Sequence, residues 1–568
     1  MIARDHPLGP VGLLTRHFFS RLFDLEFLSE RASQSLPRIV AGVAGMLIAA
    51  GLILTRVFLK RYAVLWDAET PNAWMSAVLT DHVFAIAVPM WIVAVATVTI
   101  GQSLFPDEAD FRILTPLPTR RRDIFLAKIL SVLAFGALFV AAAQAALVPL
   151  LVLSGIGPWA TMPFPISVAA NLIAGAFGGA FAALAVAAVN ALLLLLVPRH
   201  HLQTAAAAVT SLLLFVLVGG LPLVGQLPAV DRAVADHGRW LFFYPPAWFL
   251  GIERTLLGEW QHAPLAAAAL GALVVTGVIT AGAFLILYRH FDRILIRPAP
   301  AAPADSPIRL WRVRRTRRPA RAAIRSFAFL TLARSVFHQG VVVTIAAVGA
   351  AIALGSLLNA NFEASRPWGR WVVVQTVTWV PMMLIFVTTM AVRTALLVPI
   401  ELRANWVLRM TEDPRHRFDA LEGAASVLRL LGVACPVAIL FPIQWRVFGA
   451  GGLVTSAAFL VAGLLLVELV LLGWRRLPFT CSYIVGKRTA PLILIRGFLV
   501  FAAFTELAAV AARQSVAGGP GNGLIIIGLL GAVVIGLRRL RQHLRESEPL
   551  EFEDTLPTET NPLRLSEY

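Results

Sequence analysis

The chain has 568 residues, of which 58% are hydrophobic and only 14% are charged, and its formal net charge is +17. A soluble protein of this length needs a more charged surface, whereas repeated apolar runs of about 20 residues, each long enough to cross a bilayer, explain the composition. The basic residues lie in short segments between those runs and not on one soluble face, so we expect no nucleic-acid partner. Two cysteines, Cys435 and Cys481, indicate neither a disulfide framework nor a metal site.

Near the N-terminus, apolar residues recur at steps of three and four from Val11 to Leu28. This spacing predicts an amphipathic helix lying on the membrane surface, and it would also suit a helix packed on another cytoplasmic element. Five parts follow from the whole pattern of runs and linkers. They are an N-terminal cytoplasmic tail (1–37), a first six-span half (38–288), an Arg- and Pro-rich cytoplasmic linker of extended conformation (289–335), a second six-span half (336–538) and a C-terminal cytoplasmic tail (539–568).

Twelve apolar segments are predicted to span the membrane. They cover residues 39–59, 83–104, 124–153, 166–197, 203–224, 264–288, 338–358, 372–398, 424–445, 452–473, 490–512 and 523–537. With the N-terminus in the cytoplasm, the cytoplasmic segments hold roughly four times as many Lys and Arg as the outer ones. We therefore predict an all-α polytopic membrane protein in two six-helix halves, with both termini cytoplasmic. Gly175, Gly178 and Gly179 predict a close helix contact, and Pro436 and Pro442 predict kinks.

The first long cytoplasmic loop, residues 105–130, reads FPDEADFRILTPLPTRRRDIFLAKIL. An acidic block precedes a helix-sized stretch, a Pro-Leu-Pro break and a basic cluster, and the next span then begins. A loop that only connects two spans needs few polar residues, so this one suits a docking surface for another protein. Its candidate docking residues are Asp107, Glu108, Asp110, Arg112, Leu114, Pro116, Pro118, Arg120, Arg121, Arg122 and Lys128.

The second half carries a comparable loop at 399–428, again with acidic residues, a helix, Pro414 and basic residues before a span. Its candidate docking residues are Glu401, Arg403, Trp406 and Arg409. The two loops are alike in layout but not in letters, and no Lys opens the span after the second loop.

The first of these loops resembles the coupling loop between spans two and three of ATP-binding cassette type-2 permeases, and the second is similar to it in layout only. The resemblance rests on Asp110, Leu114, Pro116, Pro118, Thr119, Arg120, Arg121, Ile124 and Lys128. The N-terminal helix and the aromatic outer segment at 244–260 are similar to elements of the same family. The resemblance implies a permease subunit of an exporter in a bacterial inner membrane. It implies a separate cytoplasmic ATP-binding subunit in two copies, with homodimerisation of this chain compatible but not required.

No ATPase motif is found on this chain, because Cys481 and Arg488 stand where a phosphate loop around 485–487 would need Gly and Ser or Thr. We therefore expect no enzyme activity and no cofactor here, with ATP and Mg²⁺ bound by the partner. The spans are rich in Ala, Leu, Val, Phe and Gly, so a hydrophobic or lipid-like substrate and contact with membrane lipid fit best.

Polar residues inside the spans offer another function. They are Glu468, Glu506, Asn171, Asn190 and Gln375. Ionisable groups within spans are costly and are therefore functional candidates. In a proton-coupled secondary transporter Glu468 or Glu506 would form a relay. In a structural role Glu468 would only lie near the inner end of its span, and Glu506 would pair with Arg513 or Arg496. A lipid-modifying membrane enzyme, for which we find no cluster of His, Asp or Glu, and a scaffold remain further alternatives.

Overall fold

A computed structural model describes residues 9–23, 71–105, 120–156, 163–219, 239–289, 318–360, 367–400, 405–481, 519–547 and 549–552, with isolated positions at 45–62 and 500–514. These residues are almost all helical and contain no strand, apart from one isolated bridge between Arg476 and Glu551. The chain forms two compact units, unit 1 (Met1–Ala302) and unit 2 (Pro303–Tyr568). The division falls within the segment at 289–335 that the sequence predicts to join the halves.

Ten helices of the described part of the chain are long and apolar enough to cross a membrane. The protein is therefore an all-α, multi-pass membrane protein. Of the twelve predicted spans, those at 39–59 and 490–512 lie largely outside the described residues. The predicted span at 83–104 begins earlier than expected, because its helix starts at Pro71, where proline suits the first turn.

Unit 1 is arranged around a central long helix, α6 (Phe164–Leu196). The other helices are α1 (Gly9–Phe23), α3 (Pro71–Thr99), α5 (Arg121–Gly155), α7 (Arg199–Gly219), α9 (Pro245–Leu256) and α10 (Ala263–Arg289). Small residues on α6 admit close neighbours, since a Cβ on Gly178 would lie 2.8 Å from Met90 Cγ and one on Gly179 would lie 2.4 Å from Val140 Cγ2. The close contact predicted at these glycines is thus confirmed.

The amphipathic helix predicted near the N-terminus is present as α1, although Leu25 and Leu28 lie outside the described residues. It packs against α5, where Phe18 of α1 contacts Ile124 and Ala127. The Lys128 ammonium lies 4.7 Å from the centre of the Phe18 ring. Apolar contact and one cation–π contact therefore hold α1 in place.

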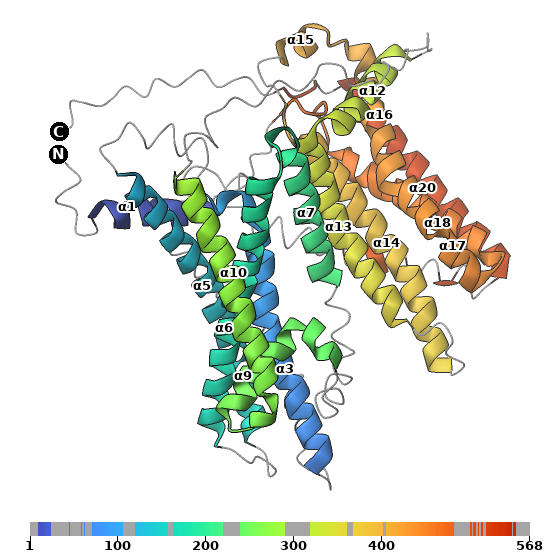
Figure 1. The fold of residues 1–568 in the computed structure, drawn as a ribbon. Coiled ribbons are helices and arrows are strands. Elements are labelled where there is room, and N and C mark those ends of the chain that lie inside the picture. The colour runs from blue at the N-terminus through green and yellow to red at the C-terminus, as the bar shows by residue number, and fades with distance from the viewer. Residues whose placement is uncertain are drawn as a thin grey trace. The chain divides into compact units, whose positions relative to one another are not determined.

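Unit 2 contains α12 (Pro319–Arg334), α13 (Val336–Asn359), α14 (Pro367–Leu397), α15 (Asn405–Met410), α16 (Arg417–Val427), α17 (Cys435–Phe448), α18 (Gly451–Leu472) and α20 (Gly519–Ser547). α12, α15 and α16 lie together at one end of this unit (Figure 1). A 3-10 turn, η7 (Pro414–His416), precedes α16, and the π-helical turn η8 (Leu428–Ala434) joins α16 to α17.

The helix α12 occupies the last part of the segment that the sequence predicts to be an extended linker, so that expectation is wrong for residues 319–334. Proline at the first turn of α12 favours helix initiation. The buried residues of α12 are Ala322, Ala328 and Leu332. It packs tightly on α16, because a Cβ on Gly423 would lie 2.7 Å from the Arg321 carbonyl oxygen.

The π-helical turn η8 has a local cause in the proline that follows it. Pro436 has no N–H, so the carbonyl of Gly432, four residues earlier, loses its helical partner. The hydroxyls of Thr388 and Thr389 on α14 donate to that carbonyl at 2.8 and 3.3 Å. The ring of Pro436 would also clash with the Gly432 carbonyl in a regular α-helix, and the wider π turns relieve that clash. The same turns place Arg429 in the buried charge cluster described next.

Candidate functional site

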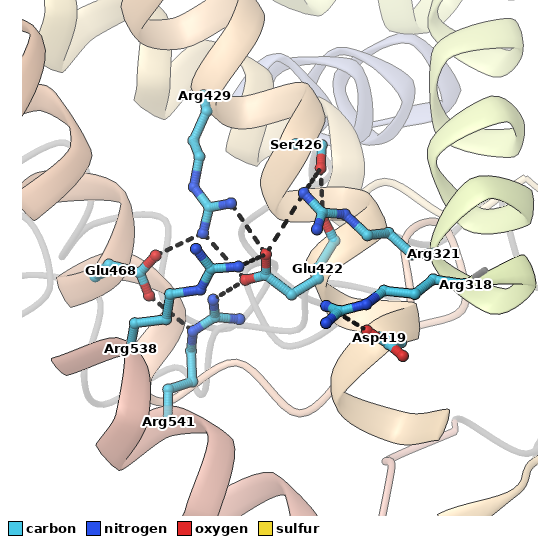
Figure 2. A network of polar contacts seen from close by, with 9 residues as sticks. All are labelled: Arg318, Arg321, Asp419, Glu422, Ser426, Arg429, Glu468, Arg538 and Arg541. Atoms are coloured by element: carbon cyan, nitrogen blue, oxygen red, sulfur yellow. Dashed lines mark hydrogen bonds and ion pairs between the residues drawn. The ribbon is translucent and has the colours of Figure 1, made fainter. Parts of the chain in front are cut away.

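A cluster of buried charges lies at the end of unit 2 that carries α12, α15 and α16. Figure 2 shows its centre, the Glu422 carboxylate of α16, which is 0% exposed. Both terminal nitrogens of Arg429 donate to it at 3.0 Å, and Arg538 of α20 donates at 2.9 Å. Arg541 of α20 donates to the same carboxylate. Arg321 of α12 lies 3.8 Å from it.

A second carboxylate, Glu468 near the end of α18, is 2% exposed and completes the cluster. It accepts hydrogen bonds from Arg429 at 2.6 Å and from Arg541 at 2.9 Å. These two arginines therefore bridge both carboxylates. We call the six residues the Arg–Glu cluster: Arg321, Glu422, Arg429, Glu468, Arg538 and Arg541.

The Arg–Glu cluster joins four separate helices and η8 at one place. Its four guanidinium groups outnumber its two carboxylates, so it carries two excess positive charges. Removing one partner of a buried ion pair leaves an uncompensated charge, which costs about 3–5 kcal/mol. A movement of α16 must therefore either carry α12, α18 and α20 along or break these pairs.

Beside this cluster, the segment that includes α15 is fixed at both ends yet exposed between them. The Asn405 side chain donates to the Thr480 carbonyl at 2.6 Å. Arg417 pairs with Glu412 at 2.6 Å. Trp406 and Met410 are 66% and 81% exposed. A fixed helix that presents large apolar side chains at the end of a bundle suits contact with another protein.

The structure separates the predicted docking residues into two environments. Arg120, Arg121 and Arg122 are exposed at the start of α5, and Trp406 and Arg409 are exposed on α15. Lys128 is only 2% exposed, because it lies beneath α1, and so it does not share the surface of the three arginines. The remaining predicted residues lie outside the described part: Asp107, Glu108, Asp110, Arg112, Leu114, Pro116, Pro118, Glu401 and Arg403.

The predicted polar residues of the spans also fall into different settings. Glu468 is paired with Arg429 and Arg541. Glu506 is exposed and lines, with Gln375, a cavity of about 320 Å³ in unit 2. The Gln375 Oε1 atom is buried with no hydrogen-bond partner among the described residues. Asn190 donates to the Val186 carbonyl within its own helix.

Asn171 belongs to a second buried polar group, which lies in unit 1 and joins α3, α5, α6 and α9. Its amide donates to Glu253 Oε2 at 2.8 Å, and His82 Nδ1 bonds to the other oxygen of Glu253. His82 Nε2 lies 3.0 Å from Ser154 Oγ. Burial alone would raise the pKa of Glu253, but the charge and hydrogen bond of His82 outweigh it and hold that pKa below 4.5.

The order Ser154, His82, Glu253 is that of a nucleophile, a base and an orienting acid. The hydrogen bonds favour a different role. The Ser154 hydroxyl donates to the Leu151 carbonyl at 2.8 Å, so His82 Nε2 must donate to Ser154 Oγ. His82 then donates from both nitrogens and forms an ion pair with Glu253 that fastens α9 to α3.

Of the residues in these two groups, the sequence alone singled out only Glu468 and Asn171, and Glu422, His82 and Glu253 are among those that it did not. Glu422 stands just before the predicted span at 424–445, and Glu253 stands in an aromatic outer segment, so each could be an ordinary interfacial residue. A usable signal was the presence of Arg429 within a span, because a charge there requires a partner.

No protein-family model, curated protein or solved structure matches this chain. Among the described residues, no group of three or more His, Cys, Asp and Glu could hold a metal ion.

Proposed function

We propose that the protein is the membrane subunit of an exporter driven by a separate cytoplasmic ATPase. The observation that carries the proposal is the exposed α15 segment beside the Arg–Glu cluster. A partner that contacts Trp406 and Met410 would push on α16, and the buried ion pairs of Glu422 would pass that displacement to α12, α18 and α20.

In this proposal the chain crosses a bacterial inner membrane twelve times, and both of its termini lie in the cytoplasm. The described basic residues of unit 2 support the orientation, since most of them, including the Arg–Glu cluster, gather at the end that carries α12 and α15. Two ATPase copies would bind, one at Arg120–Arg122 and one at α15. They would supply ATP and Mg²⁺, because this chain has no phosphate-binding motif.

The test is co-purification from detergent-solubilised membranes of the host. We expect a soluble ATPase to accompany the native chain and to be lost from Trp406→Glu, and to be weakened by replacing Arg120, Arg121 and Arg122 with Glu. Trp260→Glu is the matched control, because Trp260 is a similarly exposed Trp just before the start of α10, whereas Arg122 lies near the end of that helix. Absence of an ATPase from the native chain would overturn the proposal.

A second candidate is the proton-coupled secondary transporter, and the cavity that Glu506 shares with Gln375 favours it. A carboxylate beside an unpartnered buried amide oxygen could take up a proton on one side of a transport cycle. Glu468 does not support this candidate, since Arg429 and Arg541 both bond to it. Loss of transport in Glu506→Gln, with no ATPase bound, would favour the secondary transporter.

A further inference from the structure

A long apolar groove runs along unit 1 between α5 and α10, with α6 as its floor. Both α5 and α10 pack against α6. The groove has a volume of about 850 Å³ and is lined along α5 from Arg122 to Gln144. At 1.5 Å per helical residue, that stretch is about 33 Å long, close to the thickness of a bilayer's hydrocarbon layer.

Small side chains create the hollow. The floor is formed by Ala176, Gly179, Ala180, Ala183 and Ala187 of α6. On the walls, a Cβ added to Gly136 or to Gly277 would meet no atom within 4 Å. Space of this kind, lined by apolar groups at membrane depth, does not hold ordered water and suits a hydrocarbon chain.

The polar groups of the groove are unequally placed along its length. Arg122 and Tyr288 line the end formed by the start of α5 and the end of α10, and Arg120 and Arg289 are exposed next to them. At the other end the Gln144 amide donates to the Leu172 carbonyl at 2.6 Å, so it is satisfied within the protein. Cationic and phenolic groups at one end only suit a ligand with one anionic headgroup.

We propose that this groove binds an anionic phospholipid from the leaflet on the Arg122 side. Its phosphate contacts Arg122 and Tyr288, and an acyl chain lies along the Ala- and Gly-rich face of α6. This binding goes beyond the transport proposal, because it requires neither an ATPase nor a transport cycle.

The test counts lipids on the purified full chain by native mass spectrometry, after titration with phosphatidylglycerol or with phosphatidylcholine. We expect the native chain to retain one phosphatidylglycerol more firmly than phosphatidylcholine. The double variant Gly136→Leu/Gly277→Leu fills the groove and should lose that lipid, with affinity reduced by at least about tenfold, since several methylene contacts are removed. Gly271→Leu is the control, because it lies on α10 in open space outside the groove.

A headgroup variant tests the other half of the proposal. Arg122→Gln should reduce the preference for phosphatidylglycerol over phosphatidylcholine by about fivefold, the effect expected of one Arg at a membrane surface. Should the double variant aggregate, the single variants Gly136→Leu and Gly277→Leu are measured in its place. Unchanged lipid binding in the groove-filling variants, or an unchanged preference in Arg122→Gln, would overturn the proposal. Destabilisation of the filled variants without lipid loss would identify a protein segment as the occupant and would also overturn it.

Discussion

In each unit a helix near the start of the unit packs on a later helix, but the two contacts differ in chemistry. In unit 1, α1 rests on α5 through apolar side chains, with the Lys128 ammonium over the Phe18 ring. In unit 2, α12 meets α16 at Gly423 and contributes Arg321 to the Arg–Glu cluster. The first attachment is a sum of small contacts, whereas the second depends on charges that cannot be removed singly without leaving others buried.

The two buried ionic groups also lie in different places within their own units. The ion pair of unit 1 fastens α9, which lies at the end of that unit opposite α1 (Figure 1). The residues of the Arg–Glu cluster converge from α12, α16, η8, α18 and α20 (Figure 2), and α12 and α16 lie at one end of unit 2 (Figure 1). We infer that a push on the loop end is transmitted rigidly in unit 2 and more loosely in unit 1.

The largest effect is expected from Glu422→Ala. It removes a carboxylate that several arginines contact and leaves the buried Arg541 with one carboxylate only, so we expect unit 2 to lose about 3–5 kcal/mol of stability. Cys481, which is buried in unit 2, supplies the measurement. In a Cys435→Ser background, its rate of labelling by a thiol reagent should rise by at least about a hundredfold.

Asp419→Ala is the matched control on the same helix. Asp419 pairs with the exposed Arg318 at 3.4 Å, and such surface pairs contribute about 0–1 kcal/mol, so Cys481 labelling should change little. Equal labelling rates in Glu422→Ala and Asp419→Ala would contradict the rigid attachment that we assign to unit 2.

A smaller, pH-dependent effect is expected in unit 1. The pKa of Glu253 lies below its ordinary value of 4.5, so its ionised form stabilises the folded state fully above pH 4.5. This contribution is lost as the pH falls through the lower folded-state value. Glu253→Gln should weaken the attachment of α9 by about 1–3 kcal/mol at pH 7 and should remove the acid dependence.

The measurement uses a cysteine introduced at Ala247, a fully buried position of α9, in a chain without Cys435 and Cys481. Its labelling should accelerate in the native background as the pH falls below 4.5, after correction for thiolate content. Acceleration of the same size in Glu253→Gln would show that another group causes the acid dependence.

The smallest effect is expected from Lys128→Met. Methionine keeps the apolar contact with Phe18 and removes the ammonium, whose cation–π contact contributes about 0.5–1 kcal/mol. The thermal unfolding midpoint of the chain should therefore fall slightly and should show little dependence on salt. If Lys128→Met lost as much stability as Glu422→Ala, the attachment of α1 to α5 would also depend on a buried charge, and the two units would not differ in this respect.

The sequence predicts the membrane helices well, because each apolar run alone signals a span. It does not predict α12, because the segment is Arg-rich up to Pro319 and the buried residues of the helix are mostly alanines, which give only a weak apolar pattern. It also misses both ionic groups. Glu422 and Arg541 are 119 residues apart and His82 and Glu253 are 171 apart, and a single sequence does not report which distant residues meet.

The position of the arginines of α20 in the chain has a consequence for biosynthesis. Glu422 and Glu468 are synthesised before Arg538 and Arg541, so until α20 arrives only Arg321 and Arg429 of the cluster can pair with them. Unit 2 can reach its final packing only when α20 docks. A chain truncated before α20 would therefore keep both carboxylates but lose Arg538 and Arg541, which supply three of the ion pairs that join the helices of unit 2.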